Sequence, residues 1–76
     1  LEDEVRIGAR ARCALYLILN AGRWCTLEEI VESTGLAPIT ATQALTRLVR
    51  RYPRLFEREG QKFKFKGIFR LSEEVI

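Results

Sequence analysis

The side chains of this chain best suited to chemistry are cations, and near its end they alternate with apolar residues. In the stretch QKFKFKGIFRL, residues 61–71, Phe63, Phe65, Phe69 and Leu71 all fall on alternate positions, and the lysines and the arginine fall on the other positions. Successive side chains of an extended strand point to opposite faces, so this spacing predicts a strand with one apolar and one cationic face. Its cations repeat every ~6.6 Å, a spacing at which they can follow successive backbone phosphates. They are Lys62, Lys64, Lys66 and Arg70.

A second group of candidate binding residues falls within residues 38–51, where apolar residues recur with helical spacing. The predicted inward stripe consists of Ala41, Ala44, Leu45 and Leu48. On the outward side, Gln43 can form two hydrogen bonds with an adenine edge, and Arg47 can do the same with guanine. Short hydroxyl side chains and the arginines at the end of this helix suit contacts with phosphates. Such contacts position a protein on the duplex but do not specify the base sequence. The other polar candidates are Thr40, Thr42, Thr46, Arg50 and Arg51.

Charge is unevenly divided along the chain. The formal net charge of the 76 residues is +3, but residues 38–70 contain nine basic and two acidic side chains. Residues 1–37 contain four arginines and six acids. This division predicts an anionic partner for the C-terminal half.

Several classes of function are disfavoured by composition. The chain has no histidine, so a Cys/His zinc site is excluded. It has two cysteines, Cys13 and Cys25, which are too few for a disulfide framework. A single disulfide bond between Cys13 and Cys25 is compatible with the sequence. Neither a base-bearing nucleophile nor a phosphate-cradling glycine loop is present, so we expect no enzyme and no cofactor. No apolar run approaches the ~18 residues of a membrane helix, and we expect a soluble, intracellular protein.

One domain is expected, in which three helices precede two strands. The first helix is predicted over about 3–20, and a stripe of Ile7, Ala11, Ala14, Leu15 and Ile18 is expected to face the core. Because Cys13–Leu19 is apolar nearly all round, this part should be central or covered on a second side. The start at Leu1 suggests a piece of a longer protein.

Capping signals set the bounds of the next two helices. The segment TLEE predicts a capping box between Thr26 and Glu29, and the second helix is expected over about 27–33. Gly35 should close it, and Pro38 suits the first turn of a third helix over about 38–51. Extended segments follow over about 54–71, and a tight turn at Glu59 and Gly60 would pair Phe56 with Phe63 and Glu57 with Lys62.

The order of these elements resembles that of a winged helix-turn-helix DNA-binding domain. The similarity is strongest at TLEEIVESTGLAPITATQALTRLVRR, where Gly35 and Leu36 match the turn and Ala41 matches a small buried residue of the recognition helix. The resemblance implies an α+β, mainly α fold with a C-terminal two-stranded β-hairpin, the wing. It also implies that residues 38–51 enter the major groove of duplex DNA while the wing contacts the backbone, in transcription regulation or DNA replication and maintenance.

Two other functions fit the same sequence. The fold is also used for protein assembly, and Tyr16, Leu19, Ile39 and Ile68 are candidate anchors for a protein partner or a homodimer. RNA could bind the same basic surface. A lysine-rich strand face is also a common way to discourage edge-to-edge aggregation, without any ligand.

Overall fold

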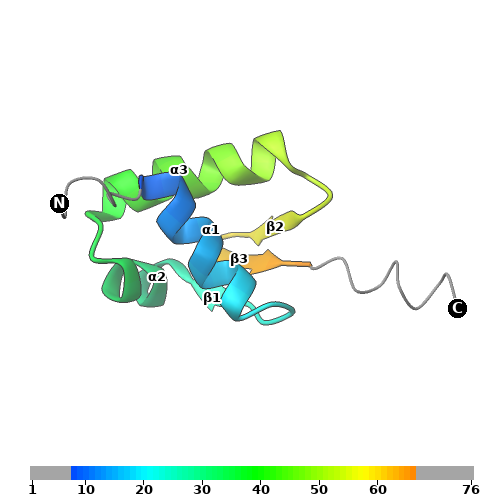
Figure 1. Ribbon diagram of the computed structural model, residues 1–76, viewed down its shortest axis with the longest axis horizontal. Coiled ribbons are helices and arrows are strands. Elements are labelled where there is room, and N and C mark those ends of the chain that lie inside the picture. The colour runs from blue at the N-terminus through cyan, green and yellow to red at the C-terminus, as the bar shows by residue number, and fades with distance from the viewer. Residues whose placement is uncertain (1–7, 67–76) are drawn as a thin grey trace, which may run out of the picture.

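The computed structural model describes residues 8–66, which form three helices and three short strands (Figure 1). The elements in chain order are α1 (Ala9–Leu19), β1 (Cys25–Thr26), α2 (Leu27–Thr34), α3 (Pro38–Arg51), β2 (Phe56–Glu59) and β3 (Lys62–Phe65). In Figure 1, α1 crosses in front of the sheet while α3 runs along one edge of the molecule. The α+β, mainly helical class is confirmed.

The bounds of α2 and α3 agree with the capping signals. The Thr26 side chain accepts a hydrogen bond from the Glu29 backbone, and the Glu29 carboxylate accepts one from Thr26 N, both at 3.2 Å. Gly35 ends α2 in the left-handed conformation, with φ of 75°. Pro38 is in the first turn of α3, where its missing N–H costs nothing. The predicted capping box is therefore confirmed.

The sheet contains one strand more than the sequence predicts. It is antiparallel with the order β1-β3-β2, so β3 is central and the expected hairpin has a third strand beside it. β1 pairs with β3 through Cys25 opposite Phe63 and Thr26 opposite Lys62. Cys25 and Thr26 lie directly before α2 and are too few to show an alternating pattern, so only their pairing with β3 identifies them as a strand.

The predicted register of the hairpin is wrong by two residues. Phe56 pairs with Phe65 and Glu57 with Lys64, not with Phe63 and Lys62. The two residues between the strands are Gly60 and Gln61, and Gly60 has the positive φ, 65°, which glycine adopts readily. A shift of two residues leaves each side chain on the same face of the sheet, so the residues predicted to face inward and outward are unchanged.

Pairing between the two strands extends to the last described residue, Lys66, whose backbone N donates to Leu55 O at 2.7 Å. On the other strand, Leu55 N and Phe56 N both donate to Tyr52 O, which closes a turn directly after α3. Consequently β2 begins at Phe56 rather than at residue 54, and the chain before it turns toward α3. The predicted strand residues from 67 to 71 lie outside the described residues.

The core receives a fully buried side chain from almost every element. The largest such side chains are Cys13 and Leu17 of α1, Cys25 of β1, Ile30 of α2, Leu45 of α3 and Phe63 of β3. β2 adds Phe56, whose ring centroid is 5.3 Å from that of Phe65. The stripe predicted for α3 is confirmed, since Ala41, Ala44, Leu45 and Leu48 are all buried.

The inward stripe predicted for α1 is largely wrong: of its described residues, Ala14 packs against the core and the others are exposed. Cys13 and Leu17 are the buried residues of this helix, whereas Leu15 is 47% exposed and Ile18 is 43% exposed. Ala11 is exposed as well, and Ile7 lies outside the described residues. Because this helix is apolar nearly all round, its sequence permits more than one stripe, and packing against α3 and β3 selects the side with Cys13. Within residues 8–66, no helix is long and apolar enough to cross a membrane.

Replacing Gly35 tests the turn between α2 and α3. A Cβ at this residue would meet no heavy atom within 4 Å, so any cost comes from the backbone conformation alone. We expect Gly35→Ala to lower the free energy of unfolding by about 1 kcal/mol, and Gly35→Asn by less, since asparagine tolerates the left-handed region better. Urea denaturation measures both. Equal stability of the two variants would contradict this role of Gly35.

Candidate nucleic-acid interface

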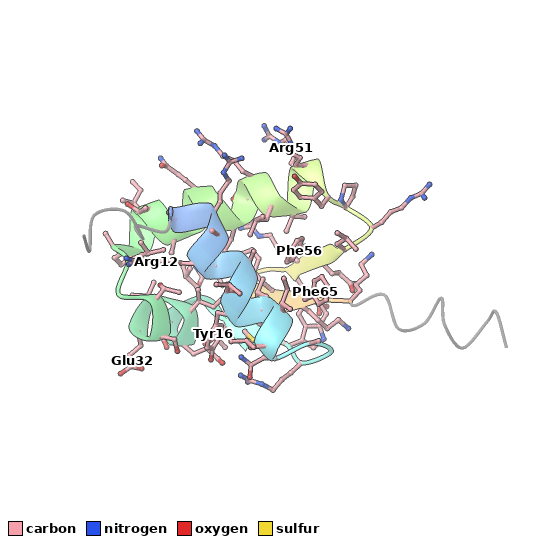
Figure 2. All side chains as sticks on the ribbon, in the orientation of Figure 1. Arg12, Tyr16, Glu32, Arg51, Phe56 and Phe65 are labelled. Atoms are coloured by element: carbon pink, nitrogen blue, oxygen red, sulfur yellow. The ribbon has the colours of Figure 1, made fainter. Side chains whose placement is uncertain are left out.

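Two rows of polar side chains occupy the side of α3 that faces away from the core. At about 100° per residue, one row contains Ile39, Gln43, Thr46 and Arg50, and a neighbouring row contains Thr40, Arg47 and Arg51. Gln43 and the three arginines are exposed, while Thr40 and Thr46 are half-buried. Figure 2 shows Arg51 on the side of α3 turned away from Phe56 and Phe65.

Four arginines surround one open hollow of about 380 Å³, which we name the arginine hollow. It is lined by Arg10 of α1 and by Arg47, Arg50 and Arg51 of α3. None of the four side chains forms a hydrogen bond or an ion pair with another residue of the described range 8–66. Four like charges around one concavity repel one another, and an anion placed among them would relieve that repulsion.

Arg10 is the member of this hollow that sequence reasoning missed. It lies in the half of the chain where acids outnumber bases, so the charge count of that half concealed it. Its placement depends on how α1 crosses α3, which is a tertiary contact. The sequence signal that could have identified it is the group of basic residues Arg6, Arg10 and Arg12 in the first half of the predicted first helix, which indicates a cationic part of that helix.

A polar hollow adjoins the arginine hollow and shares Arg10 and Arg47 with it. Its volume is about 410 Å³, and Thr40 and Gln43 complete its polar lining beside the backbone of Gly8 and Ala9. The structure therefore brings Thr40, Gln43 and Arg47 together with Arg10 on one surface. Arginine and glutamine side chains on a helix are the groups that read base edges in the major groove.

The hairpin lysines line neither of these hollows. The alternation predicted for β3 is confirmed over its four residues, because Phe63 and Phe65 are buried while Lys62 is exposed and Lys64 half-buried. Lys64 Nζ lies 3.8 Å from Glu57 Oε1 and 4.6 Å from the centre of the Trp24 ring. Lys66 Nζ donates to Pro53 O at 3.1 Å. Two of the three described lysines thus have partners within the molecule.

The remaining predicted binding residues are dispersed. Thr42 is half-buried on the flank of α3 opposite Thr40, away from the arginine hollow. Arg70 and Ile68 lie outside the described residues. Ile39 is 68% exposed at the start of α3, in the same row as Gln43. A side chain of that kind can contact a thymine methyl or a protein partner.

The most extensive polar cluster elsewhere in residues 8–66 is centred on Glu29 and is structural. Glu29 Oε2 accepts hydrogen bonds from Tyr16 Oη at 2.6 Å and from Arg23 Nη2 at 2.7 Å. With the Thr26 cap, these bonds join α1, the following loop and α2. Tyr16 is half-buried within this cluster and Leu19 is 79% exposed, so of the two partner candidates on α1 only Leu19 is open to solvent.

This cluster lowers the pKa of Glu29 from the usual 4.5 to about 2. The hydrogen bond from Arg23 is the main cause, followed by the one from Tyr16. Both stabilise the carboxylate, so Glu29 is held as a charged acceptor and cannot serve as a proton donor near neutral pH. The lowered pKa thus reflects the ion pair and hydrogen bonds that join α1, the following loop and α2.

The two cysteines are free thiols buried in the core. Burial raises the pKa of both Cys13 and Cys25 above the usual 9.0, which disfavours the reactive thiolate. Among residues 8–66, no group of three or more His, Cys, Asp or Glu side chains could hold a metal ion. The charged groups that line the two hollows described above are all arginines, which suit an anionic ligand better than a cation.

Acid titration tests the Glu29 cluster. Because the folded-state pKa of Glu29 lies below its usual value, its stabilising effect is complete above about pH 5 and is lost as the pH falls toward 2. We expect Glu29→Gln to lower the free energy of unfolding by about 1 kcal/mol at pH 7 and to flatten its decline below pH 5. Glu32→Gln, on the exposed side of the same helix, should keep the wild-type pH dependence. Identical profiles for the two variants would contradict the structural role of Glu29.

Comparisons with protein-family models, curated proteins and solved structures gave no match to this chain. The features from which a function can be inferred are the arginine hollow, the polar hollow beside it and the cationic face of the hairpin. All three present cations, amides or hydroxyls on the outside of a well-packed core.

Proposed function

We propose that this chain is a duplex DNA-binding domain that inserts α3 into the major groove. The observation that carries the proposal is the arginine hollow, in which Arg10 of α1 joins Arg47, Arg50 and Arg51 of α3. Phosphate oxygens are the anions that arginine binds best, through paired N–H donors. Duplex DNA presents such oxygens in regular rows beside a groove wide enough for a helix.

The roles of the individual side chains follow from their rows on α3. Gln43 is exposed near the middle of the outward side, where its amide can meet a base edge. Arg47 lies one turn further on and lines both hollows, so it can reach either a guanine edge or a phosphate. Arg50 and Arg51 end the helix beside Arg10, and we assign all three to phosphates.

The finer fold assignment, a winged helix-turn-helix, is part of the same proposal. In its favour, α2 and α3 are joined by a three-residue turn that begins with Gly35, and a hairpin follows α3. The third strand, β1, is an addition to the two-stranded wing expected from the sequence. It pairs with β3 on the side away from β2, and the hairpin turn at Gly60 and Gln61 stays exposed.

The hairpin contributes less to the proposed interface than the sequence suggests. Lys62, near the turn, is exposed and makes no ion pair within residues 8–66. Lys64 and Lys66 would each have to leave an internal partner to bind a phosphate, and the loss of that contact would offset part of the binding free energy. We assign Lys62 to the DNA backbone as the principal lysine contact, with Lys64 and Lys66 as weaker contributors. Arg70, which lies outside the described residues, is assigned to the backbone from its place in the sequence.

Protein binding is the second candidate, favoured by exposed apolar side chains. Ile39 is 68% exposed on α3, and Leu19 is 79% exposed at the end of α1. Tyr16, the third described candidate, is held in the Glu29 cluster and offers no free apolar anchor. Leu15 and Ile18 are exposed beside Leu19, but all three are on α1, whereas Ile39 is the exposed apolar side chain in the outward rows of α3. These rows are otherwise polar, which favours nucleic acid over a protein groove as the ligand of α3.

A matched pair of arginine substitutions on α1 tests the proposed interface. Arg10 and Arg12 are both exposed, but only Arg10 lines the arginine hollow, while Arg12 donates to Thr34 O at 3.2 Å. We expect Arg10→Ala to weaken binding to duplex DNA severalfold and to make the dependence of log K on log salt shallower by about 0.9. Arg12→Ala should change neither quantity.

Fluorescence anisotropy with a labelled duplex, at several salt concentrations, measures both effects. Wild-type binding that is absent or independent of salt would remove the proposal. Equal effects of the two substitutions would show that the DNA is attracted by the overall positive charge and would contradict the arginine hollow as the binding site. Competition by structured RNA of matched length, if stronger than by duplex DNA, would replace DNA with RNA as the ligand.

Substitutions on α3 separate base reading from phosphate binding. We expect Gln43→Ala and Arg47→Ala to weaken binding to a selected site by about 10-fold to 100-fold more than binding to random duplex, as one lost base contact would do. Arg50→Ala and Lys64→Ala, assigned to phosphates, should weaken both equally. Selection from a random duplex library supplies the preferred site, and uniform behaviour of all four variants would contradict the assigned roles.

A further inference from the structure

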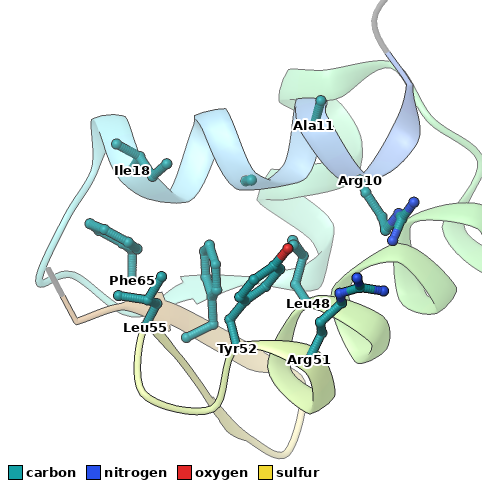
Figure 3. Close-up of a pocket in the computed structure, with 10 residues that line it drawn as sticks. Arg10, Ala11, Ile18, Leu48, Arg51, Tyr52, Leu55 and Phe65 are labelled. Atoms are coloured by element: carbon teal, nitrogen blue, oxygen red, sulfur yellow. The ribbon is translucent and has the colours of Figure 1, made fainter.

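An apolar groove of about 650 Å³ runs between α1 and the corner that joins α3 to β2 (Figure 3). Its α1 wall includes Ala14 and Ile18, and its other wall includes Leu48, Tyr52 and Leu55. Ile18 is 43% exposed and Tyr52, on the opposite wall, is 44% exposed, so the groove is open to a molecule from solution. We refer to this feature as the apolar groove.

Two arginines stand at one end of the apolar groove. Figure 3 shows Arg10 of α1 and Arg51 of α3 at this end, and Ile18, Leu55 and Phe65 at the other. The side chains of Arg10 and Arg51 form no hydrogen bond or ion pair with another residue of 8–66. No acidic residue of the same range lines the groove, so its charge is positive and confined to one end.

The cationic end favours a carboxylate as the head of a bound molecule. Guanidinium groups bind carboxylates through paired N–H donors, and a carboxylate between Arg10 and Arg51 would relieve the repulsion between these two side chains. Away from the arginines, the described side chains of the groove are apolar apart from the hydroxyl of Tyr52. A molecule that complements the whole groove therefore has an anionic head and an apolar body.

The dimensions of the groove favour a small molecule over a peptide helix. The distance along α1 from Arg10 to Ile18 is about 12 Å, a little over two helical turns. A helix about 10 Å across and of that length would occupy roughly 900 Å³, which is more than the groove provides. Sites for small molecules commonly have volumes of about 300–1,000 Å³, apolar walls and a few polar groups that fix the orientation of the ligand.

We propose that the apolar groove binds a free medium-chain carboxylic acid. Its carboxylate lies between the guanidinium groups of Arg10 and Arg51, and its alkyl chain extends past Leu48 and Tyr52 toward Ile18. The head is held by charge-assisted hydrogen bonds, and the chain is held because its methylene groups leave water. Binding is reversible and forms no covalent bond.

NMR titration of the 76-residue chain with decanoate, below its micelle concentration, tests the proposal directly. We expect saturable one-to-one binding that shifts the signals of Ile18, Leu55 and Phe65 and the side-chain signals of Arg10 and Arg51. The affinity should rise about twofold to fourfold for each methylene group added between hexanoate and decanoate. Decyltrimethylammonium, which has an alkyl chain of the same length and a positive head, should bind about 10-fold more weakly.

Three results of this titration would overturn the proposal. They are equal affinities for decanoate and decyltrimethylammonium, shifts dispersed over the whole surface, and the absence of saturable binding. NOE contacts of Ile18 in the free protein with residues outside 8–66, or with a second copy, would show that the groove is already filled and would overturn it as well. The titration contains no DNA, so its outcome is independent of the proposed DNA-binding function.

Two matched pairs of substitutions test the assigned contacts. Arg51→Gln should weaken decanoate binding about 10-fold, whereas Arg50→Gln should not, because Arg50 is exposed beside Arg51 but does not line the groove. Ile18→Ala should weaken binding about fivefold, whereas Leu15→Ala should not, because Leu15 is 47% exposed on α1 and lies outside the groove. Equal effects within either pair would overturn the proposed site.

Discussion

The structure depends on one shared apolar core that no single element could form alone. α1, β1, α2, α3 and β3 each place at least one fully buried side chain in it, and Phe63 of the central strand is the largest of these. A chain of 76 residues can bury only one such core, so every element must contribute to it. The polar side of each element is therefore turned outward, and the positions of the cations follow from this packing.

The crossing of α1 over α3 determines two concave surfaces of the molecule. It brings Arg10 to Arg47, Arg50 and Arg51 to form the arginine hollow, and it leaves the Ile18 side of α1 open along the apolar groove that Tyr52 and Leu55 also line. Arg10 and Arg51 line both concavities.

The accuracy of the sequence predictions varied with how local the determining interactions are. The capping box of Thr26 and Glu29, the end of α2 at Gly35 and the α3 stripe depend on spacings of three or four residues between neighbours in the chain, and all were predicted correctly. The hairpin register was wrong because a one-residue difference in where the turn is centred shifts every pair by two. β1 was missed because its two residues are a strand only by virtue of β3.

By itself, the sequence determined the three helices, the alternation along β3 and the excess of cations in the second half of the chain. These are properties of spacing and composition, and local geometry is enough to express them. Only the tertiary structure decided which side of α1 is buried, that Arg10 joins the arginines of α3, and that Lys64 and Lys66 have internal partners. Each of these depends on contacts between residues far apart in the chain, and a helix apolar on several sides does not specify which of them will face the core.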